Sequence, residues 1–521
     1  MIAAERLGGA LLFVAAIPAC ALAGTPPPPQ AVPWLVAAGE PTSKEALFGT
    51  AGESKPGAAD DTDEEEPEAA PKGGSPGSTG NEPPASKDAL FGTGKPGEPA
   101  SKEAPLGASA APADASAPKI WGSFDALGAY TYADPEHWSR GVGRFALAAS
   151  GALSGSVNWK LSGRVDADIV YATSNFYLEP VKVNERFSAI WGENYLDVSA
   201  GSWDFRLGAQ HIIWGEVIGI FVADVVSARD QREFLLPDFD VIRIPQWAAR
   251  AEYYAGDAHL ELIWIPVPTF DRIGKPGADF YPAPLPSPTP AAVAGLFKDP
   301  LRPDRTLSNG NYGVRANTLV SGWDVSAFYY RSFSTDPTFY RQLTGDPAQP
   351  FVYQPLYDRI WQAGGTATKD MGEFVLRMET VYTGGRSFAV TSLDAARGVV
   401  QRNTFDYVVS ADFPLAGDTH LNVQAFQRVY AGGSDSMVIK SDGFGASVFL
   451  STKLTSSLEP QILWLQNFKD AGGLIRPRLN WRLERNTLVG FGVDIFTGPS
   501  DGFFGRFNNR DRVYSELRVD F

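Results

Sequence analysis

The chain has 521 residues, a formal net charge of −15, 12% aromatic residues, 53 glycines and one cysteine. A single cysteine excludes a disulfide framework and a thiolate zinc cluster, and the acidic balance argues against a nucleic-acid partner, which requires clustered Lys and Arg. A mean hydropathy of −0.15 excludes a bundle of membrane-spanning helices. Abundant aromatics combined with abundant glycine are unusual for a soluble enzyme and require an explanation.

The first 23 residues have the pattern of an export signal. Arg6 precedes an apolar run from Leu7 to Ile17, and Ala21-Leu22-Ala23 follows. The run is too short to span a membrane and ends in small residues that a signal peptidase reads, so we interpret residues 1–23 as a signal peptide. The segment ending at Cys20 also loosely resembles a lipobox, which would make Cys20 a lipidated N-terminus. The cleavage pattern favours loss of Cys20 with the signal.

Residues 24–118 have no periodic apolar pattern and are rich in Pro, Gly and Ala. They carry 15 acidic residues and six lysines, a net charge of −9, so most of the acidity lies here. This composition cannot bury enough apolar surface to offset the entropy lost on ordering. We therefore predict a disordered acidic tether that precedes a folded domain over residues 119–521.

A short motif occurs three times in the tether, at Ser43–Gly49, Ser86–Gly92 and Ser101–Gly107. The apolar pairs that end in Phe48 and Phe91 stand out in polar surroundings and suggest docking to a periplasmic protein or to the cell wall. Repetition would raise the avidity through effective concentration. Duplication within an unconstrained linker is the alternative.

Strict alternation of apolar and polar residues begins after Trp121 and is clearest over residues 157–171. A period of two is typical of β-strands. The alternating segments are about 9–11 residues long, whereas soluble strands are usually about 5–6. The predicted fold is therefore all-β, a transmembrane antiparallel β-barrel in the outer membrane, in contact with its lipid.

Aromatic residues gather near the ends of these segments, where the two interfacial girdles of a barrel form. The predicted girdle residues are Trp121, Tyr130, Tyr132, Tyr171, Trp191, Trp214, Trp247, Trp264, Trp323, Tyr329, Trp361, Tyr382, Trp464 and Trp481.

The connections between segments alternate between short and long, as expected for short periplasmic turns and longer outer loops. The predicted strands lie near 121–132, 143–152, 156–171, 186–198, 204–214, 247–255, 258–265, 311–319, 323–331, 359–368, 373–382, 403–413, 419–430, 443–452, 457–467, 475–482, 487–496 and 512–521. With both termini in the periplasm the number must be even, and 18 satisfies this; 16 is the alternative.

The last strand alternates and ends in Phe521. A terminal Phe on such a strand resembles the signal that the barrel-assembly machinery reads, so we expect Phe521 to direct assembly. An ordinary apolar terminus is the alternative.

Polar residues on the inward faces are expected to line the lumen and to bias which solutes enter. The predicted lining residues are Arg164, Asp166, Asp168, Arg206, Gln210, Arg250, Glu252, Arg315, Arg377, Glu379, Arg428, Arg476, Arg478 and Arg482. The set contains both acidic and basic residues, so the sequence does not predict whether the pore selects anions or cations. Arg476, Arg478 and Arg482 form a local basic ladder that would guide an anionic solute such as a uronate polymer.

Two long outer loops are candidates for narrowing the pore. The alternating charges of loop 215–246 indicate an ordered, ion-paired loop at the pore mouth, with Glu216, Asp224, Arg229 and Asp230 as its predicted site residues. Loop 266–310 contains a stiff Pro-rich segment at 281–288, which we expect either to constrict the pore or to lie over its mouth. A mobile outer loop is the alternative.

Residues 205–216, followed by Asp224 and Val225, resemble the strand-plus-loop signature of a large, mostly uncharacterised family of proteobacterial outer-membrane barrels that is similar to alginate-export porins. Ala209 stands where that family usually has a basic residue, and the usual Asn-Pro after the Asp is absent. The resemblance implies a channel or exporter over roughly residues 120–521, with Gln210 and Glu216 in the lumen or at its mouth.

These features predict a channel or exporter for a polar solute or polymer, with no cofactor and no metal. One alternative is a structural barrel of an envelope-spanning machine, such as one for polysaccharide secretion, whose tether docks periplasmic partners. An enzyme would need a nucleophile placed beside a histidine, and the spacing around His137, His211, His259 and His420 offers none. Calcium in the last outer loop is a further alternative, with Asp501, Asn508, Asn509 and Asp511 as its ligands.

Overall fold

The computed structural model describes residues 118–282, 295–432, 437–438, 443–500 and 502–521. The predicted signal peptide, Cys20, the tether with its repeats, most of the Pro-rich segment and Asp501 lie outside the described residues.

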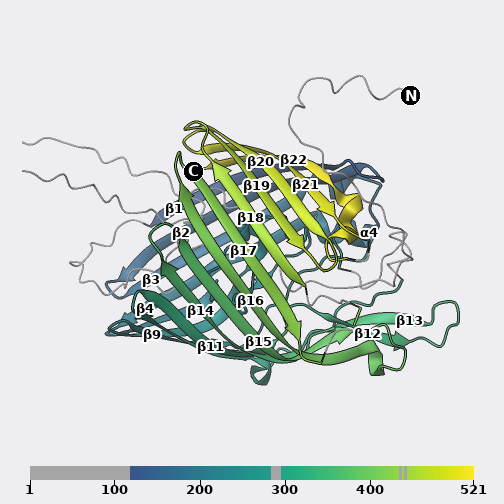
Figure 1. Ribbon diagram of the computed structural model, residues 1–521, viewed down its shortest axis with the longest axis horizontal. Coiled ribbons are helices and arrows are strands. Elements are labelled where there is room, and N and C mark those ends of the chain that lie inside the picture. The colour runs from purple at the N-terminus through teal and green to yellow at the C-terminus, as the bar shows by residue number, and fades with distance from the viewer. Residues whose placement is uncertain (1–117, 283–294, 433–436, 439–442, 501) are drawn as a thin grey trace, which may run out of the picture.

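The chain forms one closed barrel of 18 antiparallel strands (Figure 1). The strands are β1 (Lys119–Thr131), β2 (His137–Ser154), β3 (Val157–Asp168), β4 (Phe187–Ala200), β5 (Trp203–Gln210), β8 (Gln246–Ala255), β9 (Ala258–Ile265), β10 (Asn311–Val320), β11 (Trp323–Phe333), β14 (Arg359–Asp370), β15 (Val375–Ala389), β16 (Val399–Leu415), β17 (Thr419–Tyr430), β18 (Phe444–Thr452), β19 (Leu458–Asn467), β20 (Gly473–Glu484), β21 (Thr487–Thr497) and β22 (Arg512–Asp520). Each pairs with the next barrel strand, and β1 pairs with β22, so the barrel sheet itself has no open edge. The predicted fold class and the count of 18 strands are confirmed, and the alternative of 16 is wrong.

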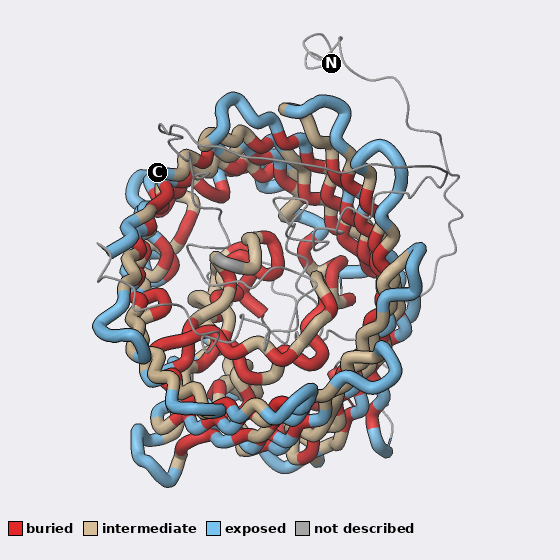
Figure 2. Tube along the Cα trace, turned by 90° about the vertical axis from the view of Figure 1, so that its left-hand side faces the viewer, coloured by how far each residue is buried: buried red, intermediate tan, exposed pale blue. Residues whose placement is uncertain are grey.

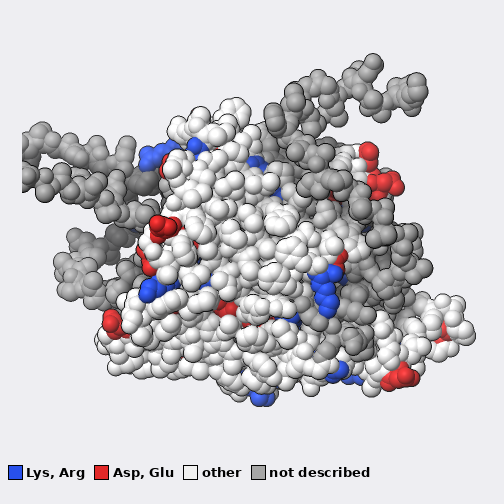
Figure 3. Space-filling model, viewed as in Figure 1, with Lys and Arg blue, Asp and Glu red and all other residues white. Residues whose placement is uncertain are grey.

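Alternation places apolar side chains on the outside of the barrel and polar ones inside. In β3, Leu161 and Val165 are exposed whereas Lys160 and Arg164 are buried. The outer face visible in Figure 3 carries few charges between the two ends of the barrel. An apolar belt of this extent is unstable in water, and a closed barrel satisfies its backbone hydrogen bonds internally. This is the architecture of an outer-membrane β-barrel.

Within the described residues, no helix is long and apolar enough to cross a membrane.

The two ends of the barrel differ as the loop lengths predict. Lys119 and Phe521 lie at the end with short turns, such as the two-residue turn at Ser321 and Gly322, whose φ values are 52° and 77°. Positive φ at both central residues matches the twist of a hairpin. The opposite end carries the long connections. One of them forms a projecting hairpin of β12 (Thr338–Leu343) and β13 (Phe351–Leu356), which the alternation did not predict (Figure 1).

Two predicted strands are too long at the outer end. β3 stops at Asp168 because its carboxylate accepts the N–H of Val170 and caps the short helix α3 (Ile169–Thr173). β5 stops at Gln210, where the chain turns into the lumen. The girdle prediction is therefore wrong for Tyr171, which is buried against Tyr177 and Val181, and for Trp214, which is buried among residues that face the lumen.

Candidate functional site in the lumen

Between β5 and β8 the chain leaves the wall, and residues 211–245, here called the lumen loop, fold inside the barrel (Figure 2). Its apolar side chains, among them Ile212, Val217 and Val226, are buried in one cluster with wall residues. The wall residues come from β8, β9, β11 and β15 to β21, and include Ala248, Ile263, Phe328, Val381, Val408, Phe426, Phe449, Leu465, Leu474 and Phe496. Apolar contact around so much of the barrel fixes the loop as a single packed body.

One wall holds the beginning of the lumen loop through two carboxylates. Glu379 of β15 accepts the backbone N–H groups of Glu216, Val217 and Ala223 at 2.5, 2.6 and 2.8 Å. Charge-assisted bonds of this kind are stronger than neutral ones. Glu216 in turn accepts from Arg315 Nη2 at 3.2 Å and from the hydroxyls of Thr366 and Thr368 on β14. The structure thus brings the predicted residues Glu216, Arg315 and Glu379 together.

The opposite wall holds the later part of the loop through Glu233. Its Oε1 lies 2.7 Å from Arg140 Nη2 and 3.3 Å from Arg144 Nη2, and its Oε2 accepts from Arg512 Nη1 at 3.2 Å. Burial alone would raise the pKa of Glu233, but the three arginines hold it well below its ordinary value. Sequence reasoning missed this cluster, although alternation places all three arginines on inward faces.

Most predicted lining residues are buried and paired along the wall. The pairs are Arg164 with Asp166, Arg206 with Asp197, Arg250 with Glu252, Arg377 with Asp412, Arg428 with Asp406, Arg476 with Asp494 and Arg478 with Glu516. Of the proposed basic ladder, Arg476 and Arg478 face acidic partners and Arg482 is exposed at the strand end. The wall is a largely neutralised lattice of ion pairs.

Gln210 is fully buried and braces the point where β5 ends. Its Nε2 donates to the carbonyl oxygens of Arg206 and Ala248 at 3.2 and 3.1 Å. Asp168 contacts Arg140 Nη1 at 3.2 Å besides capping α3. The structure therefore gives both predicted lining residues supporting contacts at the outer ends of strands.

The remaining predicted mouth residues order the outer side of the lumen loop. Arg229 Nη2 donates to the carbonyl oxygen of Asp224 at 2.7 Å, and its guanidinium lies over the Phe221 ring. Asp230 pairs with Arg232 at 2.7 Å. The N–H of Arg229 donates to Asp271 Oδ1 at 2.8 Å, which joins the lumen loop to the next outer loop.

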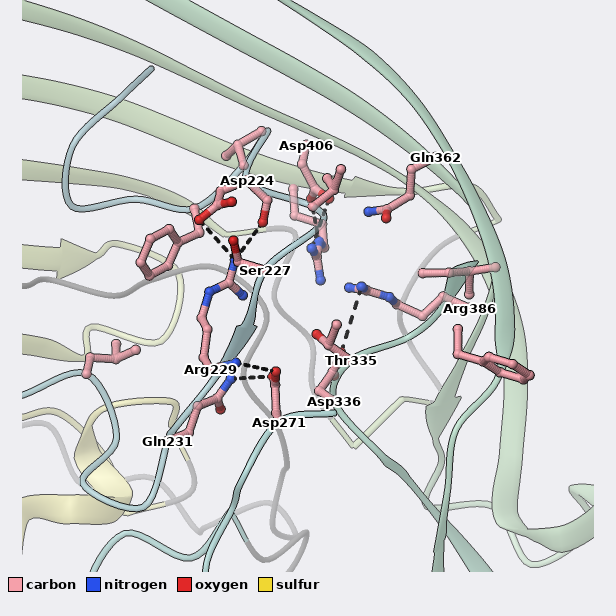
Figure 4. Close-up of a pocket in the computed structure, with 17 residues that line it drawn as sticks. Asp224, Ser227, Arg229, Gln231, Asp271, Thr335, Asp336, Gln362, Arg386 and Asp406 are labelled. Carbon is pink, nitrogen blue, oxygen red and sulfur yellow. Dashed lines mark hydrogen bonds and ion pairs between the residues drawn. The ribbon is translucent and has the colours of Figure 1, made fainter. Parts of the chain in front are cut away.

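Small cavities remain where the lumen loop meets the wall. One of about 60 Å³ lies against β14 to β17 (Figure 4). The others, of about 20 and 30 Å³, lie between the loop and the arginines of β2, β3, β20 and β22. The loop therefore fits closely against both walls at these contacts.

All four histidines are buried, and two of them contact carboxylates. His137 Nε2 lies 3.2 Å from both oxygens of Asp279, and His259 Nε2 lies 3.0 Å from Glu252. His211 is buried where the lumen loop begins, and His420 is buried in β17. In the part of the chain that the structure describes, no three His, Cys, Asp or Glu side chains are placed to hold a metal.

Residues 184–439 match the model of a family described as "Protein of unknown function (DUF1302)". This segment contains the lumen loop and the 205–216 signature. The predicted likeness to alginate-export porins stays a prediction.

The barrel also resembles solved structures at very low identity. OccAB1 of Acinetobacter baumannii matches with 8% identity and a TM-score of 0.47, over 78% of this chain and 96% of that one. OccK2 (OpdF) of Pseudomonas aeruginosa, solved in complex with glucuronate, matches with 10% identity and a TM-score of 0.44, over 78% and 97%. Salmonella typhi OmpF, in complex with daunomycin, matches with 8% identity and a TM-score of 0.39, over 78% and 97%. No curated protein sequence matches the chain.

Proposed function

We propose that the protein is an outer-membrane channel for small polar solutes, with the lumen loop as its constriction. The observation that carries this proposal is the attachment of one loop to two facing walls, through Glu379 on β15 and through Arg140 on β2. A loop that only covered the barrel mouth would not bond to side chains inside the wall. Fixed charges around such a constriction would select solutes by size and charge.

Planar-bilayer recording of the purified full chain tests the channel. We expect discrete conductance steps, and larger or noisier steps for Glu379→Gln, because the neutral amide holds three backbone N–H groups less strongly than the carboxylate does. Glu373→Gln is the matched control, since this glutamate is exposed beside the turn before β15. Its conductance should equal that of the wild type.

A plugged structural barrel or exporter is the second candidate, because the cavities at the loop contacts hold at most a few waters. In that case the acidic tether would dock periplasmic partners. Silence of correctly folded wild-type protein in the bilayer would reject the channel and favour this candidate. Turnover of lipid or peptide by the same sample would instead favour an enzyme.

A further inference from the structure

The cavity of about 60 Å³ between the lumen loop and the wall, here called the wall pocket, brings together side chains from distant parts of the chain (Figure 4). Gln362 of β14 and Arg386 of β15 reach into it from the wall, while Arg229 faces them from the lumen loop. Asp271 and Asp336, from two outer loops, complete the rim. The pocket therefore lies beside the proposed constriction, on its outer side.

The three arginines of the wall pocket differ in how well they are bonded. Arg428 binds Asp406 through both Nε and Nη2, and Arg229 donates to the carbonyl oxygen of Asp224. The side chain of Arg386 is 13% exposed, and within the part of the chain that the structure describes its one ion-pair partner is Asp336, at 3.9 Å. Its Nε is buried and, like the Nε of Arg229, has no hydrogen-bond partner among the described residues.

A buried guanidinium with unused donors is costly unless an acceptor is supplied. Arg presents its N–H groups in a planar fork that matches the two oxygens of a carboxylate. Gln362 adds a second donor, because its Nε2 donates one bond to another described residue, Thr383, at 3.3 Å. A planar oxygen anion is thus the chemistry that complements Arg386.

The surrounding acids restrict the charge of that anion. Asp224, Asp336 and Asp406 all line the wall pocket, and a phosphate, with a charge of about −1.5 to −2 at neutral pH, would be repelled more strongly than a carboxylate. The volume of about 60 Å³ admits a carboxyl group and a short chain. Asp271 repels an anion less than a fully ionised carboxylate would, because burial raises its pKa to about 7, and its oxygens accept from Arg229 N–H and Gln231 Nε2.

We propose that the wall pocket binds the carboxylate of a small monocarboxylate solute, with Arg386 as its anchor and Arg229 and Gln362 as supporting contacts. This proposal rests on the channel function and names the class of solute that the channel would pass.

The test is a titration of the full-length protein in detergent with sodium acetate at constant ionic strength, followed by line broadening of the acetate methyl resonance. We expect saturable binding that weakens about tenfold or more in Arg386→Gln, since loss of one charge-assisted pair is of order 1.5–3 kcal/mol. Arg386→Lys should restore only part of it, because an ammonium lacks the fork. Inorganic phosphate should bind more weakly than acetate.

Arg402→Gln is the matched control. Arg402 pairs in register with Arg386 across the sheet but does not line the wall pocket, so its loss should change acetate binding by less than about twofold. An equal loss in both variants, or phosphate binding as tight as acetate, would overturn the proposal. If Arg386→Gln does not fold, Gln362→Leu takes its place, and undiminished acetate binding in that variant would count against the pocket.

The two proposals fail in different ways. A protein that gives conductance steps without saturable acetate binding is a channel that lacks this site. A silent protein whose acetate binding depends on Arg386 retains the site and rejects the channel.

Discussion

Glu233 is the residue on which three arginines of the lumen wall converge, and it is the sharpest single test of the loop anchor. Removing one partner of a buried ion pair costs about 3–5 kcal/mol, because the other charge stays buried and unpaired. In Glu233→Gln, Arg140, Arg144 and Arg512 would all lose this carboxylate. We expect amide exchange over residues 231–236 at pH 7 to accelerate by about two orders of magnitude.

Glu179→Gln is the control for the loss of a loop glutamate. Glu179 begins α4 (Glu179–Glu185), its side chain is 68% exposed, and its nearest cation, Lys182, is 3.8 Å away. Surface pairs contribute about 0–1 kcal/mol, so exchange over 231–236 should not change. Unchanged exchange in Glu233→Gln itself would show that the loop is held by its apolar contacts alone.

For single residues, the sequence predicts which face of a strand a side chain lies on better than it predicts which residue that side chain contacts. The period of two places Arg315, Glu379 and Arg428 on inward faces, and the structure has all three buried. Glu233 lies 89 residues from Arg144 and 279 from Arg512, and no local pattern encodes contacts across a lumen.

At the scale of elements, Asp271 couples the lumen loop to the outer loop that follows β9, and it makes the contact pH-dependent. Burial raises the pKa of Asp271 to about 7, with Arg229 lowering it only in part. Because this pKa is above the ordinary value, protonation favours the packed loops. The stabilisation is complete below about pH 4 and is lost as the pH rises through 7. Amide protection over residues 229–231, corrected for intrinsic rates, should therefore fall from about pH 4 to pH 7 and change little above pH 7.

Asp271→Asn should abolish that slope, because the amide oxygen still accepts the Arg229 N–H and carries no titrating proton. Glu185 titrates in the same range, since burial raises its pKa to about 7 against Arg140 and Arg232. Glu185→Gln is therefore the matched control and should leave the slope at 229–231 in place. A slope that persists in Asp271→Asn would assign the pH dependence to another group.

Strands and loops differ in how far the sequence predicts them. Alternation located all 18 barrel strands, because one face meets lipid and the other polar surroundings along their whole length. The alternation failed to predict the strand ends at Tyr171 and Trp214, where the chain leaves the wall. The rings of these two residues pack against other loops and the inner wall. The charges of loop 215–246 indicated an ordered loop, but only the folded barrel shows that it lies within the lumen.

At the scale of the whole molecule, the barrel depends on one seam that joins the first and last strands. Ser123 to Thr131 of β1 pair with Arg512 to Asp520 of β22. Beyond them, the Gly122 N–H donates to the Phe521 oxygen at 2.8 Å and the Phe521 N–H donates to the Gly122 oxygen at 2.9 Å. This pairing joins strands at opposite ends of the barrel sequence, and contacts of such long sequence separation form slowly.

Phe521 contributes both a backbone and a side chain to the seam, and the two can be separated. The residue is 57% exposed. Its ring lies over Gly122, where an added Cβ would come within 2.5 Å of it, and stacks on the Phe145 ring with the centroids 5.9 Å apart. Deletion of Phe521 removes the backbone bonds and the ring, whereas Phe521→Ala removes only the ring. If the ring is read during assembly, both variants should lower the yield of heat-modifiable barrel in outer membranes several-fold. Phe444→Ala, which removes another exposed aromatic on β18, should not. A normal yield in Phe521→Ala with a reduced yield in the deletion would instead assign the terminal residue to closure of the seam.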